Sequence, residues 1–519
     1  MTLTAPRESL VQAMLDPQFY PKPPESVSHK ETHISHLFFA GDLVYKVKKA
    51  VRYSFLDYST LAKRRHLLQE ELRLNRRLAP SVYMGVLPIT FDDLGWRLGG
   101  WAEPAEYTLV MRRLPEKRML PFLLDTGQVT LAMMRELAEL LAGFHADAAR
   151  VSGIDSERYP ALVQAQWNDN LADLAQASTP VIDAENYLAM EKFGAEFFLR
   201  HGETLKRRAS SGWLRDVHGD LHAEHVCFAP EGIQIFDCIE FEAKFRQCDL
   251  AAELAFLLMD IEVRGGATLI APFLQRYREL IDDPEAAELL PFWKCYRALV
   301  RAKVYALRGD SGFDTACRYG RYATALAWLP LQPFLAIVSG LTGSGKSTLA
   351  RELSARTGVP TINSDVVRKV LAQKKGRQVA SYNQGIYSAA MTEKTYAKMA
   401  EEAERLIVGG RGVILDGTFV KQSQRGKILS LAHKHQIPLL AIHCMVSDDI
   451  TQARLTQRER EGKDVSDGRW EIYVQQRDGF EALDDIPAAD RLELDTDAGL
   501  DELVVACEKF LRAKLPGHC

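Results

Sequence analysis

The chain has 519 residues, more than one ordinary domain holds, and with 47% apolar and 26% charged residues it has the composition of a globular protein. Lys plus Arg number 65 against 69 Asp plus Glu, and this net charge of -4 argues against bulk electrostatic binding to nucleic acid. The eight cysteines are scattered, the N-terminus lacks a signal-like apolar core, and no run approaches the ~20 apolar residues of a membrane span, so we expect a cytoplasmic protein with reduced thiols.

The first part of the chain is predicted to contain a lead segment, residues 1–30, and a small mixed lobe, residues 31–112. Two short apolar runs in this lobe are joined by Gly41-Asp42, which predicts a β-hairpin. The expected elements are the two hairpin strands, one helix and a last strand, at His36–Ala40, Leu43–Val47, Leu61–Leu78 and Tyr107–Met111.

A larger, mostly helical lobe is predicted for residues 113–327. It is interrupted by a strand-rich island around His218–Glu240, and its last helical stretch runs from about Phe292 to Ala327. A small mixed lobe followed by a larger helical lobe is the order of a two-lobed, protein-kinase-like body. We therefore predict an α+β N-terminal domain over residues 31–327.

The prolines of Trp328–Pro333 end this helical stretch, and an α/β domain with a parallel sheet is predicted for residues 334–519. From Phe334 onward, apolar runs alternate with amphipathic helical segments. The runs are FLAIVS, PTINS, GVILDG and LLAIHCMV. Short buried runs that alternate with helices are typical of a parallel sheet covered by helices.

A glycine-rich loop follows the first of these runs. It consists of Gly340, Leu341, Thr342, Gly343, Ser344, Gly345, Lys346, Ser347 and Thr348. The glycines let successive backbone N–H groups turn toward phosphate oxygens, Lys346 neutralises the terminal phosphates, and the Ser347 hydroxyl can hold Mg²⁺. The predicted strand Phe334–Ser339 and helix Ser347–Ala355 supply the required context, and the helix dipole adds to the attraction. The sequence therefore predicts a site for ATP or GTP.

Two further features indicate a kinase. Val413–Asp416 is an apolar strand that ends in a carboxylate, as the acid that orients Mg²⁺ requires. Asp365 and Arg368 stand three residues apart where a helix should begin, so they share one face of it. The aspartate could accept a proton from an acceptor hydroxyl, while the arginine grips an anionic group.

Arg454 and Arg458 lie one turn apart on the predicted helix Asp449–Glu461, as in a lid that stabilises a transferred phosphoryl group. Together these residues resemble the P-loop small-molecule kinases, a group that includes polynucleotide 5′-kinase, gluconate kinase and the zeta-type toxins. The resemblance covers roughly residues 334–515. It implies that Asp365 is the general base and that Arg368 contacts a substrate phosphate.

A second chemical cluster runs from His218 to His225 with the sequence HGDLHAEH and continues to Asp237. A phosphotransferase of the protein-kinase type needs one Asp to orient the acceptor hydroxyl and another, about seventeen residues on, to bind Mg²⁺. Asp220 and Asp237 have that spacing. They are the predicted catalytic and metal-binding residues of a second site.

The HGDLH run resembles the aminoglycoside phosphotransferase family, which includes choline and homoserine kinases and shares the kinase fold. The likeness covers residues 31–325 and implies a lysine on the VYKVK strand, paired with a helix glutamate, that orients the nucleotide phosphates. Lys46 and Lys48 lie on the same strand face; Lys46 is favoured because it directly follows the apolar run. Glu71 is the expected partner, and Glu70 competes with it. The whole chain thus resembles predicted bacterial proteins that fuse such a domain to a P-loop kinase.

Two departures from the family pattern stand out. His225 replaces the family's metal-binding Asn, and imidazole is a poor Mg²⁺ ligand compared with an amide oxygen. His225 could bind a different metal, contact phosphate, or mark a weakened site, while Glu240 or Glu242 could supply the missing oxygen. In addition, no glycine-rich loop precedes the lysine strand, where the chain reads Glu31–His36.

The leading functional hypothesis is a bifunctional phosphotransferase that uses ATP (or GTP) and Mg²⁺ to phosphorylate hydroxyls of small molecules, with one site per domain. A second hypothesis makes the N-terminal domain a binding module without catalytic competence. A third is polynucleotide 5′-kinase activity, which the net acidity disfavours, and a fourth is an ATPase switch without an acceptor. The sequence identifies neither acceptor and no oligomeric state.

Overall fold

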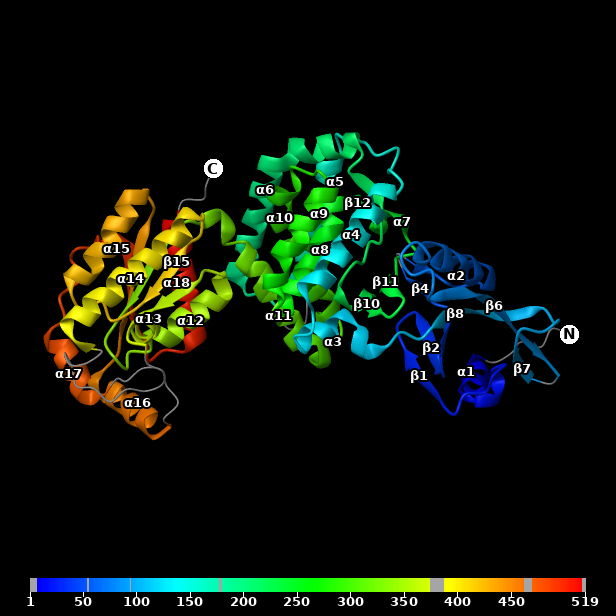
Figure 1. Ribbon diagram of the computed structural model, residues 1–519, viewed down its shortest axis with the longest axis horizontal. Helices are drawn as coiled ribbons and strands as arrows, with labels where there is room; N and C mark the ends of the chain where they lie inside the picture. Colours follow the sequence, from blue (N-terminus) through cyan, green and yellow to red (C-terminus); the bar gives the residue numbers. More distant parts are fainter. Residues whose placement is uncertain are drawn as a thin grey trace. The chain divides into compact units, whose positions relative to one another are not determined.

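The computed structural model of the chain (Figure 1) describes residues 7–53, 56–93, 95–176, 180–373, 387–461 and 469–515. The chain divides into two compact units, and each is described by itself. The first contains residues 1–169 and 197–300, and the second contains residues 170–196 and 301–519. Within the described ranges, every helix is too short or too polar to span a lipid bilayer.

The small lobe of the first unit is a twisted antiparallel sheet with one helix that carries a site residue. Its described strands follow the spatial order β1-β2-β3-β8-β6-β7. They are β1 Val27–Glu31, β2 Ser35–Ala40, β3 Leu43–Lys48, β6 Tyr83–Asp92, β7 Gly95–Leu98 and β8 Pro104–Arg112, and the helix α2 spans Leu61–Asn75. The predicted hairpin is confirmed, because β2 and β3 pair with Ala40 opposite Leu43.

The N-terminal helix α1 (Arg7–Leu15) belongs to this lobe and is not a separate lead. Its Leu10 and Met14 are buried in one cluster with Phe38, Tyr45 and other residues of the sheet. An amphipathic segment that covers an exposed sheet face removes apolar area from water, which explains why it docks there. The short strands β4 (Arg52–Tyr53) and β5 (Leu56–Asp57) form a separate small ladder.

The large lobe is helical, with two small strand pairs that hold the predicted island. Its helices are α3 Leu120–Asp125, α4 Leu131–Asp147, α5 Tyr159–Ala175, α6 Ala184–Ser211, α7 Ala243–Arg246, α8 Leu250–Val263, α9 Ile270–Leu280 and α10 Ala286–Ala306, of which α5, α6 and α10 also extend into the second unit. Its strands are β9 Leu214–Asp216, β10 Val226–Ala229, β11 Gly232–Ile235 and β12 Gln247–Asp249, paired as β10 with β11 and β9 with β12.

The second unit contains a parallel sheet with the order β14-β15-β13-β16-β17. Its strands are β13 Leu335–Ser339, β14 Thr361–Asn363, β15 Val413–Asp416, β16 Leu439–Met445 and β17 Arg491–Asp495. Its helices are α11 Asp310–Leu326, α12 Lys346–Thr357, α13 Ser364–Leu371, α14 Ala389–Val408, α15 Gln422–His435, α16 Asp448–Glu461, α17 Trp470–Asp478 and α18 Leu500–Lys514. The predicted parallel sheet is confirmed.

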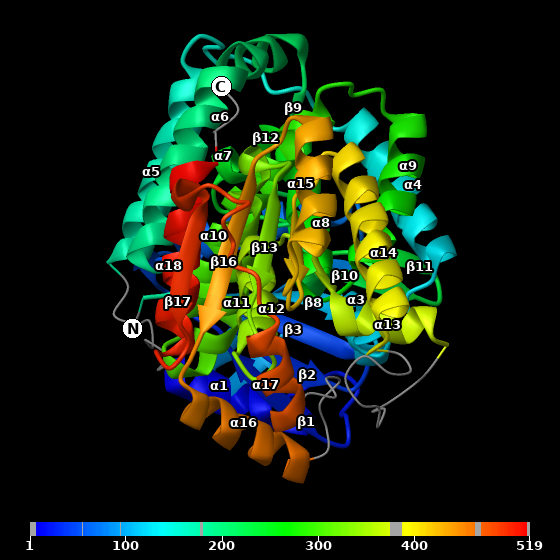
Figure 2. The ribbon, with the colours of Figure 1, turned by 90° about the vertical axis from the view of Figure 1, so that its left-hand side faces the viewer.

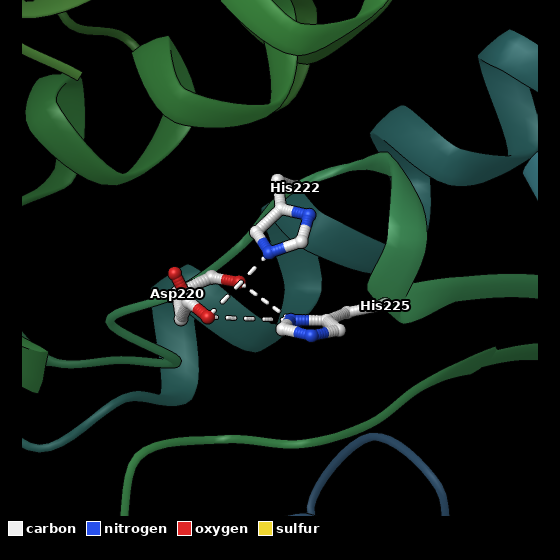
Figure 3. A group of neighbouring side chains, drawn as sticks. All are labelled: Asp220, His222 and His225. Atoms are coloured by element: carbon white, nitrogen blue, oxygen red, sulfur yellow. Dashed lines mark hydrogen bonds and ion pairs between the residues drawn. The ribbon is translucent and has the colours of Figure 1, made fainter. Parts of the chain in front are cut away.

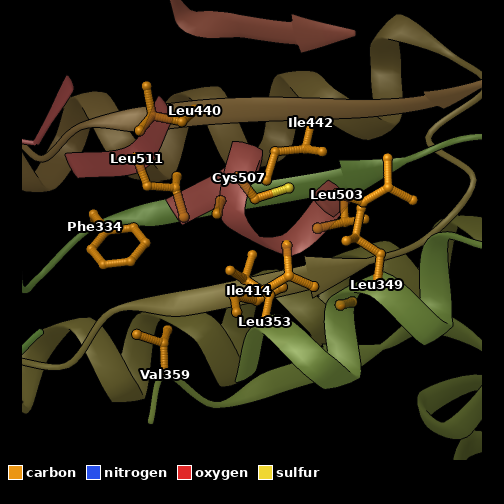
Figure 4. Packing of buried hydrophobic residues seen from close by; sticks show 14 of the residues in the cluster. Phe334, Leu349, Leu353, Val359, Ile414, Leu440, Ile442, Leu503, Cys507 and Leu511 are labelled. Atoms are coloured by element: carbon orange, nitrogen blue, oxygen red, sulfur yellow. The ribbon is translucent and has the colours of Figure 1, made fainter. Parts of the chain in front are cut away.

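Helices cover both faces of this sheet. Residues of α12 and α18 form one buried cluster with one face of the strands (Figure 4), and α14 and α15 form another cluster with the opposite face (Figure 2). Both faces are buried, which explains why the strands are continuous apolar runs. The arrangement leaves the carboxyl ends of β13 and β15 free to carry the phosphate loop and Asp416, where ligands of open α/β sheets bind.

The compact units group some residues differently from the predicted domain boundary. Residues 170–196 and 301–327 pack with the P-loop part of the chain. Trp328 and Leu331 are buried in one cluster with Leu349 of α12, and Arg356 of the same helix lies 3.8 Å from Asp183. The predicted helical stretch from Phe292 to Ala327 contains two helices, α10 and α11, and Gly309 between them has a positive φ of 65°.

Candidate functional sites

The loop between β13 and α12 has a backbone that only glycine permits at two positions. Gly340 and Gly343 have φ values of 147° and 85°. A Cβ atom at Gly340 would lie 2.6 Å from the carbonyl oxygen of Cys444, and one at Gly343 would lie 2.8 Å from a Thr451 methyl carbon. The glycines of the motif therefore serve both the turn and the close packing of the loop, as a phosphate cradle requires.

Lys346 begins α12, and its Nζ donates to the carbonyl oxygen of Leu341 at 3.3 Å. Asp416 ends β15 and is 2% exposed. Its Oδ2 accepts a 2.5 Å hydrogen bond from Nδ2 of Asn363 on the neighbouring strand, and its Oδ1 has no hydrogen-bond partner among the described residues. Burial raises the pKa of the Asp416 carboxyl, against the opposing effect of Lys346. A buried carboxylate oxygen without a donor fits a site for a divalent cation.

A cleft of about 490 Å³ brings the predicted residues of this unit together. Lys346, Ser347, Asp416, Asp365 and Arg368 all line it. The first three belong to the phosphate end of the cleft, and the last two belong to α13. The cleft therefore joins the loop that can bind nucleotide phosphates to two side chains of opposite charge, the Asp365 carboxylate and the Arg368 guanidinium.

The local fold of α13 aims Asp365 and Arg368 into this cleft. Asn363 caps the helix, because its Oδ1 accepts from the backbone N–H groups of Asp365 and Val366 at 2.9 and 3.0 Å. Arg368 Nη1 donates to Asp365 Oδ1 at 2.5 Å, and the guanidinium lies over the ring of Tyr387 with 4.8 Å to its centroid. Arg368 is 7% exposed, so its charge is held in place before any ligand arrives.

Arg454 and Arg458 are not among the residues that line the cleft. Arg454 lies beside the phosphate loop instead, where Nη2 donates to the carbonyl oxygen of Thr496 at 2.7 Å and Nη1 donates to its hydroxyl at 3.2 Å. That hydroxyl also donates to the carbonyl oxygen of Ser344 at 2.7 Å. In this structure Arg454 thus ties α16 to the loop and to the end of β17.

The lysine pair on β3 shares one glutamate in the first unit. Lys46 Nζ lies 2.7 Å from Glu71 Oε1 and 3.1 Å from Asp237 Oδ1. Lys48 Nζ lies 2.7 Å from Glu71 Oε2 and 2.5 Å from Glu240 Oε1. Burial alone lowers the pKa of both lysines, but the facing carboxylates outweigh it and raise both pKa values well above the usual range. Both lysines are therefore held as cations.

The geometry separates the alternatives that the sequence left open. The side chain of Lys48 is fully buried and also bonds the Tyr58 hydroxyl at 3.0 Å, whereas that of Lys46 is 13% exposed and reaches Asp237. Glu71 is buried between the lysines, while Glu70 pairs with Arg73 on the outer side of α2. Lys46 and Glu71 thus have the placement expected of the phosphate-orienting pair.

Asp220 lies in a loop that is held in place by hydrogen bonds to Glu253 and Phe236. The backbone N–H groups of His218 and Gly219 donate to Glu253 at 2.8 and 3.1 Å, and His218 Nε2 contacts the carbonyl oxygen of Phe236 at 2.9 Å. Gly219 has a φ of 84°, and a Cβ there would lie 2.9 Å from the backbone of Arg246. Burial raises the pKa of Glu253 to about 7. The carboxylate of Asp220 is left partly exposed in the site.

Asp237 is held in a conformation that a non-glycine residue seldom adopts. Its φ is 62°, and its backbone N–H donates to the Tyr83 hydroxyl at 3.1 Å. Lys46 is the largest cause that lowers the pKa of the Asp237 carboxyl below its usual range, against the effect of burial. Backbone strain of this kind is concentrated at functional sites. The carboxylate is ionised and fixed near Asp220.

His222 and His225 lie next to each other on the same side of Asp220 (Figure 3). His222 Nε2 is 3.5 Å and His225 Nδ1 is 3.7 Å from Asp220 Oδ2, while His225 Nε2 is 3.6 Å from Asp237 Oδ2. Asp220, His222 and His225 each offer a ligand atom within 4.8 Å of the others. This arrangement contains imidazole nitrogen where an amide oxygen was expected.

Of the two glutamates that could supply the missing oxygen, Glu240 accepts from Lys48 Nζ and from the Tyr58 hydroxyl at 2.6 Å, and Glu242 caps α7. Tyr58 had no motif to mark it. The hairpin turn between β1 and β2 lies where a glycine-rich loop would be expected, and it is held by Thr32, whose N–H donates to the carbonyl oxygen of Ser35.

The chain matches known proteins in both parts. The model of the phosphotransferase enzyme family matches residues 17–290, and a model described as an AAA domain matches residues 335–483. An uncharacterized protein of Mycobacterium tuberculosis is 31% identical over 446 residues, covering 84% of this chain and 87% of that protein. A cytidylate kinase of Methanobrevibacter smithii is 29% identical over 150 residues, covering 28% of this chain and 74% of that enzyme. The solved gluconokinase of Sinorhizobium meliloti 1021 matches with 19% identity and a TM-score of 0.26, over 35% of this chain and 93% of its own.

Proposed function

The chain belongs to the phosphotransferase enzyme family, and from this premise we propose that it is an ATP- and Mg²⁺-dependent kinase with one active site in each domain. The predicted fusion of an aminoglycoside-phosphotransferase-like domain with a P-loop kinase-like domain is confirmed by the two family matches. Both domains are of kinase-like families, so the chemistry proposed is phosphoryl transfer to a hydroxyl.

The observation that carries the proposal is the single cleft that gathers Lys346, Ser347, Asp416, Asp365 and Arg368. The glycine loop and the unpartnered Asp416 oxygen fit a Mg²⁺-nucleotide. Mg²⁺ held by Ser347 and Asp416 would neutralise charge on the phosphates. Lys346 and the loop amides would bind the β- and γ-phosphates of ATP.

At the other end of the cleft, Asp365 would take the proton of the acceptor hydroxyl as the oxygen attacks phosphorus. Arg368 donates a hydrogen bond to this carboxylate and restrains it until an acceptor displaces the pair. The guanidinium, released from Asp365, would then bind an anionic group of the acceptor. Lys421 and Lys427 also line the cleft, where they pair with Glu481 and Glu393. On the basis of Arg368, we propose a small hydroxyl compound that carries a negative charge. Arg454 and Arg458 would close over the phosphates only after Arg454 leaves Thr496.

In the N-terminal domain, Asp220 would orient and deprotonate the acceptor hydroxyl. Lys46, held by Glu71, would orient the α- and β-phosphates of ATP. Asp237 would bind the metal ion. The ion pair of Lys46 with Glu71 is the one that an assembled kinase site requires, and it supports activity at this site, where Asp237 would exchange its contact with Lys46 for the metal ion.

A second candidate function rests on His225. An imidazole in place of an amide supports a domain that binds nucleotide or ligand without transferring phosphate, next to a working P-loop kinase. Transfer to the 5′-hydroxyl of an oligonucleotide is a further alternative for the P-loop site. The net charge of -4 disfavours it.

A screen of hydroxyl metabolites with labelled ATP tests these proposals, run on the wild type, Asp220→Ala and Lys346→Ala. We expect two sets of acceptors, one lost in each variant and unaffected in the other. If Asp220→Ala leaves all transfer intact while Lys346→Ala removes it, the N-terminal domain is a binding module. If oligonucleotides are the acceptors lost in Lys346→Ala, the small-molecule assignment is wrong.

A further inference from the structure

The imidazole of His225 is oriented by a backbone oxygen. Its Nδ1 lies 2.8 Å from the carbonyl oxygen of Asp220. A carbonyl oxygen only accepts hydrogen bonds, so this contact requires a proton on Nδ1. In the neutral ring the lone pair is then on Nε2. Backbone carbonyls fix the tautomer of metal-binding histidines in the same way.

That lone pair faces the free oxygen of Asp237. Nε2 of His225 is 3.6 Å from Oδ2 of Asp237, while Oδ1 of the same carboxylate is held by Lys46 at 3.1 Å. A separation of 3.6 Å is too long for a hydrogen bond. When the ring is neutral, this lone pair and the carboxylate oxygen repel each other, and a metal cation bound between them would remove the repulsion.

The spacing suits one ion. With bonds of about 2.1 Å to nitrogen and to oxygen, a 3.6 Å separation of the ligand atoms corresponds to an angle of about 120° at the metal. The ring of His222 packs on His225, with 4.0 Å between the centroids, and restricts the orientation of its plane. The two ligand atoms are thus preset by the backbone, by Lys46 and by ring packing.

The chemistry of the donors selects the metal. Mg²⁺ prefers oxygen ligands, whereas imidazole binds first-row transition-metal ions, with an affinity that rises from Mn²⁺ to Cu²⁺. We propose that the N-terminal site binds a first-row transition-metal ion between His225 Nε2 and Asp237 Oδ2, and that it discriminates against Mg²⁺. This deepens the proposed function of the site and rests on its nucleotide phosphates supplying further oxygen ligands. Asp220 is not a ligand of this ion, and its proposed role toward the acceptor is unchanged.

Mn²⁺ is the probe, because its electron spin detects bound nitrogen. The protein is the full chain with Lys346→Ala, which removes nucleotide-assisted binding at the P-loop, studied with Mn²⁺ alone and with Mn²⁺ and ADP. We expect electron spin-echo modulation from an imidazole ¹⁴N. It should disappear in His225→Asn and persist in His222→Phe, which keeps the ring packing but removes the nitrogens. In His225→Asn, the Mg²⁺ concentration that displaces half of the Mn²⁺ should fall by about tenfold or more.

Asp237→Asn should weaken Mn²⁺ binding as His225→Asn does, and the thermal unfolding of each variant shows that it is folded. The assignment is overturned if the wild-type signal contains no imidazole modulation. It is also overturned if His222→Phe abolishes the modulation and Asp237→Asn retains it, because the ion then lies among Asp220, His222 and His225. Unchanged metal competition in His225→Asn, with Mg²⁺-supported phosphoryl transfer by this domain, refutes the metal assignment but not the proposed function. If Mn²⁺ binds as expected but this domain transfers no phosphate, the metal assignment holds and the proposed function of this domain is refuted.

Discussion

Lys48 and Lys46 stand two residues apart on one strand face, and replacing each by methionine should have different consequences. The side chain of Lys48 is fully buried and is engaged by Glu71, Glu240 and the Tyr58 hydroxyl. Lys48→Met leaves the buried Glu71 with Lys46 and leaves Glu240, in a dry environment, with the Tyr58 hydroxyl in place of a cation. Breaking a buried ion pair in this way costs about 3–5 kcal/mol. In a unit of this size, that loss lowers the midpoint of thermal unfolding by about 10 °C.

Lys46→Met should cost less, because Lys46 is partly exposed and its partner Asp237 is 47% exposed on its side chain. A lost hydrogen bond between charged groups costs about 1.5–3 kcal/mol. Its main effect should be on nucleotide binding by the N-terminal domain. The two variants therefore form a matched pair, with the same chemical change on the same strand.

The assay is calorimetric unfolding of both variants, with the P-loop unit as an internal reference because its transition should not move. Binding of ADP is measured by titration in the Lys346→Ala background. We expect Lys48→Met to be the less stable by about 2 kcal/mol and Lys46→Met to be the weaker binder. If Lys48→Met unfolds at the wild-type temperature and loses ADP binding while Lys46→Met retains it, the roles are reversed and the reasoning from burial is refuted.

Three further changes test other parts of the structure. Glu253 is a buried acid with a pKa raised to about 7, so it favours folding below its unfolded pKa, and this contribution is lost as pH rises toward 7 and above. In the wild type, the free energy of unfolding should therefore fall by about 3 kcal/mol between pH 5 and 8, and Glu253→Gln should remove this fall. Urea titrations at several pH values measure it, and parallel pH profiles of the variant and the wild type would contradict the reasoning. Gly343→Ala places a Cβ atom 2.8 Å from a Thr451 methyl carbon, at a residue with a positive φ. The substitution should abolish nucleotide binding by the P-loop and leave the circular dichroism spectrum unchanged. A wild-type nucleotide affinity would show that the loop tolerates the methyl group. Arg208 is fully buried between Asp249 and Asp283, and Arg208→Met should destabilise the first unit by about 3–5 kcal/mol. Arg207 is its exposed neighbour, and Arg207→Met should cost under about 1 kcal/mol. Equal midpoints of chemical denaturation for the two variants would refute the stabilising role of the buried Arg208.

Local sequence determined the features whose physics is local. The phosphate loop could be read directly, because its glycine backbone, its lysine and the helix that follows are contiguous. The hairpin of β2 and β3 and the buried strands of the parallel sheet followed from apolar runs and turn residues. Strand β17 was missed, because RLELD alternates with polar residues and occupies a sheet edge beside β16. The spacing of Asp220 and Asp237 placed both near one site without fixing their partners.

Only the tertiary structure decided between residues that the sequence made equivalent. The two-residue period of a strand puts Lys46 and Lys48 on one face. Their burial distinguishes them, because the side chain of Lys48 is fully buried and that of Lys46 is 13% exposed. Glu71 and Glu70 are adjacent, but only Glu71 faces β3. Arg454 had the spacing of a lid residue, yet its guanidinium binds Thr496, which is distant in sequence. Residues 170–196 belong to the P-loop unit because they contact residues far away in the sequence, as in the ion pair between Asp183 and Arg356. Sequence specifies which chemical groups are present and their local geometry, whereas their partners depend on long-range packing that no local pattern records.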